Sequence, residues 1–277
     1  MHLTREHIDA YCLSLLADER SAGTISKYRR DLTAFARWLD GRAVTKESAT
    51  AWKACLLNRD YAPRTVNSML AAVNGFCRFA GLPIKVKFLK IQRQIFRDSS
   101  RELTKEEYDR LLAAARESDQ ERLALIMETL CATGIRVSEL RYITVEAART
   151  GRATITLKGK IRTILLPAKL CRKLVKYARK QKIAAGEIFL TSSGRGISRR
   201  QVWFELKRLC KAAGVEPTKV FPHNLRHLFA TTFYHASRDI VRLADMLGHS
   251  SIDTTRIYLT VSGAEQQRQL DRLGLVS

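Results

Sequence analysis

Apolar residues recur at steps of three and four along two segments near the start of the chain. In residues 24–40 they stand at Ile25, Tyr28, Leu32, Phe35 and Leu39, with Ser21 or Thr24 available as an N-cap. In residues 64–83 the same spacing repeats and then stops at Gly81 and Pro83. This period matches the roughly 3.6 residues of a helical turn, so each segment can bury one face. The first part of the chain is therefore predicted to be a helical domain.

A second unit is predicted to begin near residue 102. Thr104 and Glu107 stand three residues apart ahead of a Leu/Ala-rich stretch, which indicates a capping box at the start of a helix. The apolar stretch that follows predicts a central helix that is interrupted at Gly134. Residues 153–167, ATITLKGKIRTILLP, alternate in polarity and predict a β-hairpin with lysines at its tip. The expected fold class is mainly α with a small β-sheet, in two domains.

The charge of the chain indicates the class of its partner. It has 49 Lys and Arg against 27 Asp and Glu, a formal net charge of +22, which favours a nucleic acid because basic surfaces neutralise phosphates and release counterions. No apolar run approaches the ~18 residues of a membrane-spanning helix, and the N-terminal stretch carries acids where a signal peptide would be apolar. We therefore expect a cytoplasmic protein with no membrane partner.

The six cysteines are widely scattered and form no C-x-x-C pair. This pattern argues against a zinc ribbon and against a disulfide framework, so reduced and mostly buried thiols are expected.

Several polar residues stand inside apolar segments. Arg136 follows CATGI at what should be a buried helix junction, where a guanidinium needs a partner or an anion, and Glu139 is the candidate partner. In FPHNLRHLFATTF, His223 and Arg226 share one helical face just after Pro222, where free N–H groups favour an anion. His227 lies on the same face, but no Glu completes an H-E-x-x-H pattern and no third ligand is evident. No metal site is therefore predicted.

Three stretches, ATGIRVSEL, HNLRHLFAT and LGHSSIDTTRIYL, occur in this order and resemble the three boxes of the tyrosine recombinase family, the phage integrases and Xer-like enzymes. Arg226 and His249 are 23 residues apart, and His249 precedes Tyr258 by nine residues, as in Xer-like members. The resemblance implies that Arg136, His223, Arg226 and His249 surround a scissile phosphate, which Tyr258 attacks. It also implies that Glu139 orients Arg136.

The hairpin supplies the remaining candidate for catalysis. The basic residue that the family carries on a β-hairpin is similar to Lys158 in LKGKIR, and its expected role is general acid for the leaving 5′-oxygen. The turn is shorter here than the family's usual pattern, so Lys160 is an alternative for the same role.

The resemblance also implies a domain organisation: residues 1–83 as a helical, SAM-like core-binding domain, 84–101 as a basic linker, and 102–277 as the catalytic domain. The two domains would form a clamp around DNA. The tail around Leu270, Leu273 and Leu275 would form a C-terminal helix that is exchanged between protomers, with packing on its own subunit as the alternative. The expected partners are double-stranded DNA with inverted-repeat core sites and three further copies of the chain. The enzyme would be a monomer when free and a homo-tetramer on two DNA sites.

The implied activity is site-specific cleavage and rejoining of DNA strands through a 3′-phosphotyrosyl intermediate, without metal, ATP or other cofactor. Such an enzyme is typical of mobile elements, and integration, excision and dimer resolution all remain open. The chain begins almost directly with the core-binding pattern, so core sites without distant arm sites are expected.

A type IB topoisomerase or a telomere resolvase would use the same residues. A non-catalytic DNA-binding protein would lack one of them, whereas none is missing here. A role on a membrane surface or in phosphoprotein binding would explain the charge but not the ordered His, Arg and Tyr positions.

Overall fold

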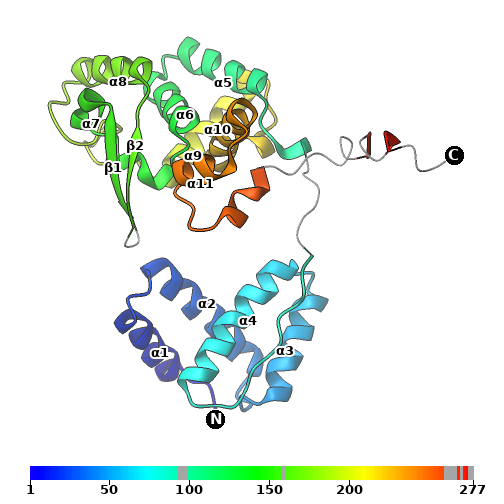
Figure 1. Ribbon diagram of the computed structural model, residues 1–277. Helices are drawn as coiled ribbons and strands as arrows, with labels where there is room; N and C mark the ends of the chain where they lie inside the picture. The colour runs from blue at the N-terminus through cyan, green and yellow to red at the C-terminus, as the bar shows by residue number, and fades with distance from the viewer. Residues whose placement is uncertain (93–98, 158–159, 259–266, 269–270, 274–277) are drawn as a thin grey trace. The chain divides into compact units, whose positions relative to one another are not determined.

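A computed structural model describes residues 1–92, 99–157, 160–258, 267–268 and 271–273. The chain divides into two compact units, Met1–Arg93 and Gln94–Ser277, which are described here one at a time (Figure 1). The described helices include none that is long and apolar enough to cross a membrane.

The first unit is a bundle of α-helices. Its helices are α1 (Arg5–Ala17), α2 (Ala22–Leu39), α3 (Lys46–Asn58) and α4 (Pro63–Phe79). The side chain of Ser21 caps α2 by accepting a hydrogen bond from the Thr24 N–H, and Pro63 occupies the first turn of α4. The two helices that the apolar spacing predicts are thus confirmed as α2 and α4. Their shared core contains Leu32, Phe35 and Phe76, which are fully buried.

Residues 84–92, expected to be a linker, lie in extended form against α3 and α4 (Figure 1). The Asn74 side chain donates to the Val86 carbonyl (2.9 Å) and accepts from the Val86 N–H (2.8 Å). Two helical turns earlier, Asn67 makes the same pair of bonds with Leu89. These amides replace the backbone partners that a neighbouring strand would provide, so the segment has a fixed path along the first unit.

The second unit is mainly helical with one small sheet, as predicted. Its elements are α5 (Lys105–Glu117), α6 (Glu121–Thr133), α7 (Val145–Thr150), β1 (Arg152–Leu157), β2 (Lys160–Leu165), α8 (Ala168–Lys180), α9 (Arg199–Ala213), α10 (Pro222–Ser237) and α11 (Ile240–Leu247). Short 3₁₀ helices include Ser99–Arg101, Val137–Tyr142, Pro217–Lys219, Ile252–Thr254 and Arg256–Tyr258. The capping box at Thr104 and Glu107 is confirmed at the start of α5, and α6 ends at Gly134 (φ +63°).

The antiparallel pairing of β1 with β2 confirms the predicted hairpin. Its register places Ile155 opposite Arg162, and the buried side chains on the inner face are Ala153, Ile155 and Ile164. Ile161 and Leu165 are instead largely exposed. Since side chains alternate along a strand, this register turns Arg162 toward the interior of the unit.

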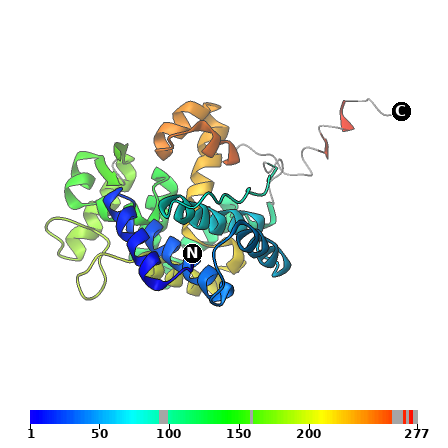
Figure 2. The same cartoon turned by 90° about the horizontal axis from the view of Figure 1, so that it is seen from below.

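Two hydrophobic clusters lie in the second unit. The larger joins α5 to α9 and includes Leu225 on α10, while the smaller contains Phe229, Leu243, Leu247 and Tyr258. Helix α10 thus contributes to both clusters. Figure 2 shows the end of α10, α11 and the turns that follow as one group, coloured orange. The junction between the clusters is where the polar residues of the sequence motifs meet.

Several sequence predictions fall partly outside the described residues. Lys158 is one of the residues that are not described, and so are Leu270 and Leu275 of the expected C-terminal helix. The cysteines are free thiols, and Cys12, Cys77 and Cys210 among them are buried.

Candidate active site

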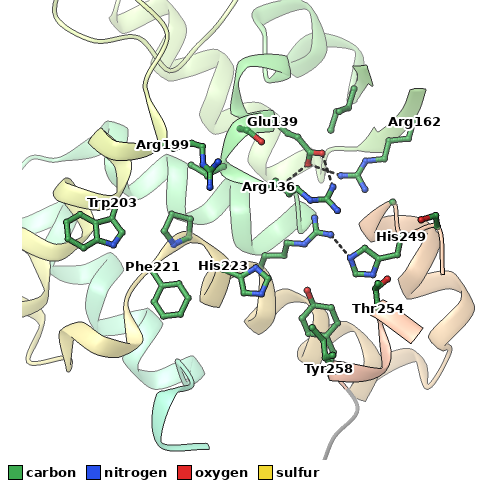
Figure 3. A pocket seen from close by; sticks show the side chains of 18 of the residues that line it. Arg136, Glu139, Arg162, Arg199, Trp203, Phe221, His223, His249, Thr254 and Tyr258 are labelled. Atoms are coloured by element: carbon green, nitrogen blue, oxygen red, sulfur yellow. Dashed lines mark hydrogen bonds and ion pairs between the residues drawn. The ribbon is translucent and has the colours of Figure 1, made fainter. Parts of the chain in front are cut away.

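A cavity of about 1200 Å³ lies in the second unit among residues of α9, α10, the β1–β2 hairpin and the turns that follow α11; Figure 3 shows its side chains. The predicted site residues that line it are Arg136, His223, Arg226, His249 and Tyr258. They come from three separate stretches of sequence, and the fold brings them to one place. The sixth predicted residue, Lys158, lies outside the described residues.

Arg136 follows the end of α6, where Gly134 turns the chain into the Val137–Tyr142 helix. The Glu139 carboxylate accepts from the Arg136 backbone N–H at 2.7 Å and from its Nη1 at 3.2 Å, so the predicted partner is confirmed. Glu139 is almost fully buried, whereas the Arg136 side chain is 43% exposed. The expectation that Arg136 is buried is therefore wrong: its guanidinium projects into the open cavity (Figure 3).

The buried arginine is Arg226, which is 3% exposed. It donates to the carbonyls of Gly134 and of Leu247 (2.8 Å to the latter). These carbonyls stand at the C-terminal ends of α6 and α11, where free C=O groups carry partial negative charge. Burial and the neighbouring Arg136 lower the pKa of Arg226, and the electrostatic interaction with Tyr258 opposes that shift. The guanidinium stays charged at neutral pH because its ordinary pKa is so high.

His223 stands in the first turn of α10, immediately after Pro222, as predicted. Its side chain faces the cavity (Figure 3). Desolvation lowers its pKa below 6.5, and the nearby charges of Arg226, His227 and Arg136 lower it further. His223 is therefore neutral near pH 7 and can accept a proton.

His249 follows Gly248, which ends α11 in a left-handed conformation (φ +65°). Its Nε2 lies 3.0 Å from Arg226 Nη2, and its Nδ1 lies 2.9 Å from Thr255 Oγ1. Burial, followed by the charges of Arg226 and Arg136, lowers the pKa of His249 to about 4. The ring is therefore held between two partners in its neutral form.

Tyr258 ends the 3₁₀ helix Arg256–Tyr258 rather than an α-helix, and only 3% of it is exposed. Its ring stacks on His249 with centroids 6.1 Å apart and lies 5.0 Å from the ring of His227. Tyr258 lines the cavity and lies close enough to Arg226 to affect the pKa of that guanidinium. Packing thus fixes the ring while the phenol oxygen remains at the cavity.

Arg162 was not predicted as a site residue, yet it donates to the Glu139 carboxylate at 2.8 Å and to the Met246 carbonyl at 3.2 Å. Its guanidinium occupies the space that a Cβ on Gly248 would need, since that atom would overlap Arg162 Nη1. Strand alternation could have indicated an inward Arg162, but only once the register of the hairpin was known. Arg199, Arg200 and Trp203 on α9 also line the cavity and were not predicted.

His227 does not belong to a metal site in the part of the chain that the structure describes. Its Nε2 lies 3.2 Å from a Glu102 carboxylate oxygen. Among the described residues, no cluster of three or more His, Cys, Asp or Glu side chains is placed to hold a metal ion.

Comparisons with known proteins identify the family of the chain. The phage integrase family matches residues 101–265, and the N-terminal SAM-like domain of phage integrases matches residues 8–81. Tyrosine recombinase XerA of Pyrococcus furiosus is 30% identical over 99% of this chain and 96% of its own length. Tyrosine recombinase XerC of Roseiflexus castenholzii is 33% identical over 91% of this chain and 88% of its own length.

Two solved structures share the fold. XerH recombinase bound to its difH substrate aligns with a TM-score of 0.70 at 17% identity, covering 97% of this chain and 84% of XerH. A lambda integrase tetramer bound to a Holliday junction aligns at 0.73 and 19% identity, covering 91% of this chain and 76% of the integrase.

Family and fold therefore agree with the motif resemblance, and the chain belongs to the phage integrase family. It is accordingly an enzyme of site-specific DNA recombination, of the tyrosine recombinase class.

Proposed function

We propose that this enzyme cuts a DNA strand by attack of the Tyr258 oxygen on a phosphodiester that sits in the cavity, and rejoins it by the reverse reaction. The observation that carries the proposal is the convergence of Arg136, His223, Arg226, His249 and Tyr258 on one cavity from three distant stretches of sequence. The new bond joins phosphorus to the tyrosyl oxygen, and the bond to the 5′-oxygen breaks. The product is a 3′-phosphotyrosyl ester, which keeps the bond energy needed for rejoining.

The arginines stabilise the charge that develops on the non-bridging oxygens. Arg136 extends into the cavity, while Arg226 is fixed by two helix ends. Fixed donors of this kind do not have to reorganise as the transition state forms, which is why they favour it over the ground state. His249 adds a third donor to a non-bridging oxygen.

Two proton transfers accompany the reaction. A tyrosine has an ordinary pKa of about 10, so its proton needs an acceptor, and His223 is neutral for this purpose because its pKa is lowered. The leaving 5′-oxygen needs a proton in return. A lysine at the hairpin tip can donate it, and we assign Lys158 to this role, with Lys160 as the alternative.

The proposed substrate is double-stranded DNA with inverted-repeat core sites, held by residues 1–83 and 102–277 as core-binding and catalytic domains joined by the basic linker. The net charge of +22 supports binding to a polyanion. A homo-tetramer on two sites is the proposed working form, since the structurally similar lambda integrase is a tetramer on a Holliday junction. The DNA substrate implies action in the cytoplasm.

Replacing Tyr258 with Phe tests the mechanism, because the change removes one oxygen and keeps the packed ring. Nicked, end-labelled duplexes that tile the DNA flanking the gene serve as substrates, and a denaturing gel detects the covalent adduct. The wild-type protein should shift a labelled strand, and protease should reduce the adduct to a peptide remnant. Tyr258→Phe should bind DNA and form no adduct. An adduct with the Phe variant would overturn the proposal.

A further inference from the structure

Thr255 is a fully buried residue whose hydroxyl contacts the imidazole of His249. None of it is exposed, and its Oγ1 lies 2.9 Å from His249 Nδ1. The backbone on either side is fixed, since the Thr255 N–H donates to the Ile252 carbonyl and the Thr255 carbonyl accepts from the Tyr258 N–H. The hydroxyl is therefore held against the imidazole by the same turn that positions the tyrosine.

The other side of the ring determines which nitrogen carries the proton. Arg226 Nη2 lies 3.0 Å from His249 Nε2, and a guanidinium can only donate. Nε2 must then accept, so the neutral ring carries its proton on Nδ1. In the DNA-free enzyme, Thr255 Oγ1 therefore accepts a hydrogen bond from the His249 Nδ1–H.

A phosphate in the cavity reverses this requirement. Phosphate oxygens are acceptors, so His249 can bond one only by donating from Nε2. If the ring stays neutral, Nδ1 then has a lone pair and needs a donor. A threonine hydroxyl can rotate from acceptor to donor without moving its heavy atoms.

Charge favours a neutral ring even with DNA present. Five guanidiniums line the cavity, those of Arg136, Arg162, Arg199, Arg200 and Arg226, and Glu139 is the one carboxylate among the described lining residues, which leaves an excess of four positive charges. A phosphodiester cancels one of them. A protonated imidazole would therefore still be repelled, in keeping with the lowered pKa of His249.

We propose that Thr255 is a positioning residue that lets His249 exchange one neutral tautomer for the other when the scissile phosphate binds. One proton leaves Nδ1 for water and one from water reaches Nε2, so the ring gains no net charge. The Thr255 hydroxyl changes from acceptor to donor, and Arg226 Nη2 is released from Nε2 to the phosphate. This inference rests on the proposed function, in which His249 donates a hydrogen bond to the scissile phosphate.

The kinetic test compares Thr255→Val, which keeps the shape and removes the hydroxyl, with Thr255→Ser, which keeps the hydroxyl. Thr129→Val is the matched control, because Thr129 is equally buried and its hydroxyl donates to a backbone carbonyl of its own helix. Thr255→Val should slow single-turnover adduct formation about 10–100-fold with DNA affinity unchanged, by analogy with the loss of a hydrogen-bond partner behind a metal-ligating histidine. Thr255→Ser should restore most of the rate, and Thr129→Val should match the wild type.

The direct readout is the pair of side-chain ¹⁵N signals of His249, assigned by their loss in His249→Gln. The free enzyme should show the Nδ1–H tautomer. The Tyr258→Phe enzyme, which cannot cleave, should show the Nε2–H tautomer when it is bound to the nicked duplex. The double variant Tyr258→Phe, Thr255→Val should keep the Nδ1–H tautomer on the same DNA.

An imidazolium signal on DNA would overturn the proposal, as would a wild-type cleavage rate for Thr255→Val. Either result leaves the proposed function intact as long as the wild-type enzyme forms its Tyr258 adduct. Absence of that adduct would instead remove the proposed function, and this inference with it.

Discussion

Both units bury polar side chains among apolar ones, but these side chains have different partners. In the first unit, Asn74 bonds the backbone of Val86 on both sides and fixes the path of an extended segment. In the second unit, Arg226 also bonds backbone carbonyls, yet it lines an open cavity. The same physical requirement, that a buried polar group be paired, thus fixes the path of a backbone segment in the first unit and the position of a positive charge in the second.

The position of Arg226 depends on more of the fold than the position of Asn74 does. A buried guanidinium is stabilised there by the carbonyls at the ends of α6 and α11, elements far apart in the sequence. The position of the charge therefore depends on the packing of both helix ends, whereas Asn74 depends on a segment only a few residues beyond its own helix.

The largest expected effect comes from replacing Arg226 with Lys. An ammonium group keeps the charge but cannot bond Gly134, Leu247 and a phosphate in one fixed plane. Adduct formation should fall about 10²–10³-fold, or about 2.7–4 kcal/mol, as when one fixed transition-state donor is lost. Single-turnover assays at saturating protein measure this, with circular dichroism to confirm folding.

Arg122→Lys is the control for that change. Arg122 also bridges a carbonyl, that of Leu190, and a carboxylate, that of Glu205, but it lies away from the cavity lining. Equal adduct rates for the two lysine variants would contradict this prediction, because Arg226 would then have only a structural role, like Arg122.

A smaller effect, on stability alone, is expected for Asn74→Ala. The change leaves the buried N–H and C=O of Val86 unpaired, which should lower the free energy of unfolding by about 1–3 kcal/mol. Asn67→Ala breaks the same two bonds at Leu89, but both residues are half-buried, so water can replace the amide and the loss should be smaller. Denaturant titrations measure both variants. If Asn74→Ala instead reduced the adduct yield at saturating protein, the first unit would have a part in the chemistry.

The smallest expected effect is a dependence of stability on pH that originates in the second unit. The pKa of His249 is lowered from 6.5 to about 4 by burial, so the unfolded chain takes up a proton at this residue at a higher pH than the folded one. The free energy of unfolding should therefore fall as the pH drops from about 6.5 to about 4, by about 1–2 kcal/mol after allowance for solvent screening. Below this window both states are protonated and the contribution stops changing.

His249→Gln isolates this contribution, since the glutamine does not titrate. The difference between wild-type and variant unfolding free energies, measured at several pH values, should shrink across the window. A constant difference would show that the half-buried His249 does not resist protonation.

The sequence predicted what depends on neighbours along the chain. The spacing of Leu32 and Phe35 gave a helix, and Thr104 with Glu107 gave its capping box. The motif resemblance named five residues that the fold brings to one cavity. Which arginine would be buried could not be predicted, because the carbonyls around Arg226 come from the ends of distant helices.

Arg162 and Thr255 escaped prediction for a related reason. Arg162 faces inward through a strand register that depends on the length of the hairpin turn, and Thr255 meets His249 through a 3₁₀ turn without an apolar period. Lys158 stays a prediction.

The carboxylate of Glu139 caps the start of the Val137–Tyr142 helix by accepting from the Arg136 N–H. It also pairs with the guanidiniums of Arg136 and Arg162, which come from different segments of the chain. In a drifting lineage, loss of Glu139 would leave two guanidiniums without their carboxylate, and loss of Arg136 or Arg162 would remove one of the two partners of Glu139, so each single change is expected to weaken the cluster. Adaptation to new DNA targets is therefore expected to proceed through residues elsewhere on the protein surface. The chemistry would be inherited as a unit while specificity diverges around it.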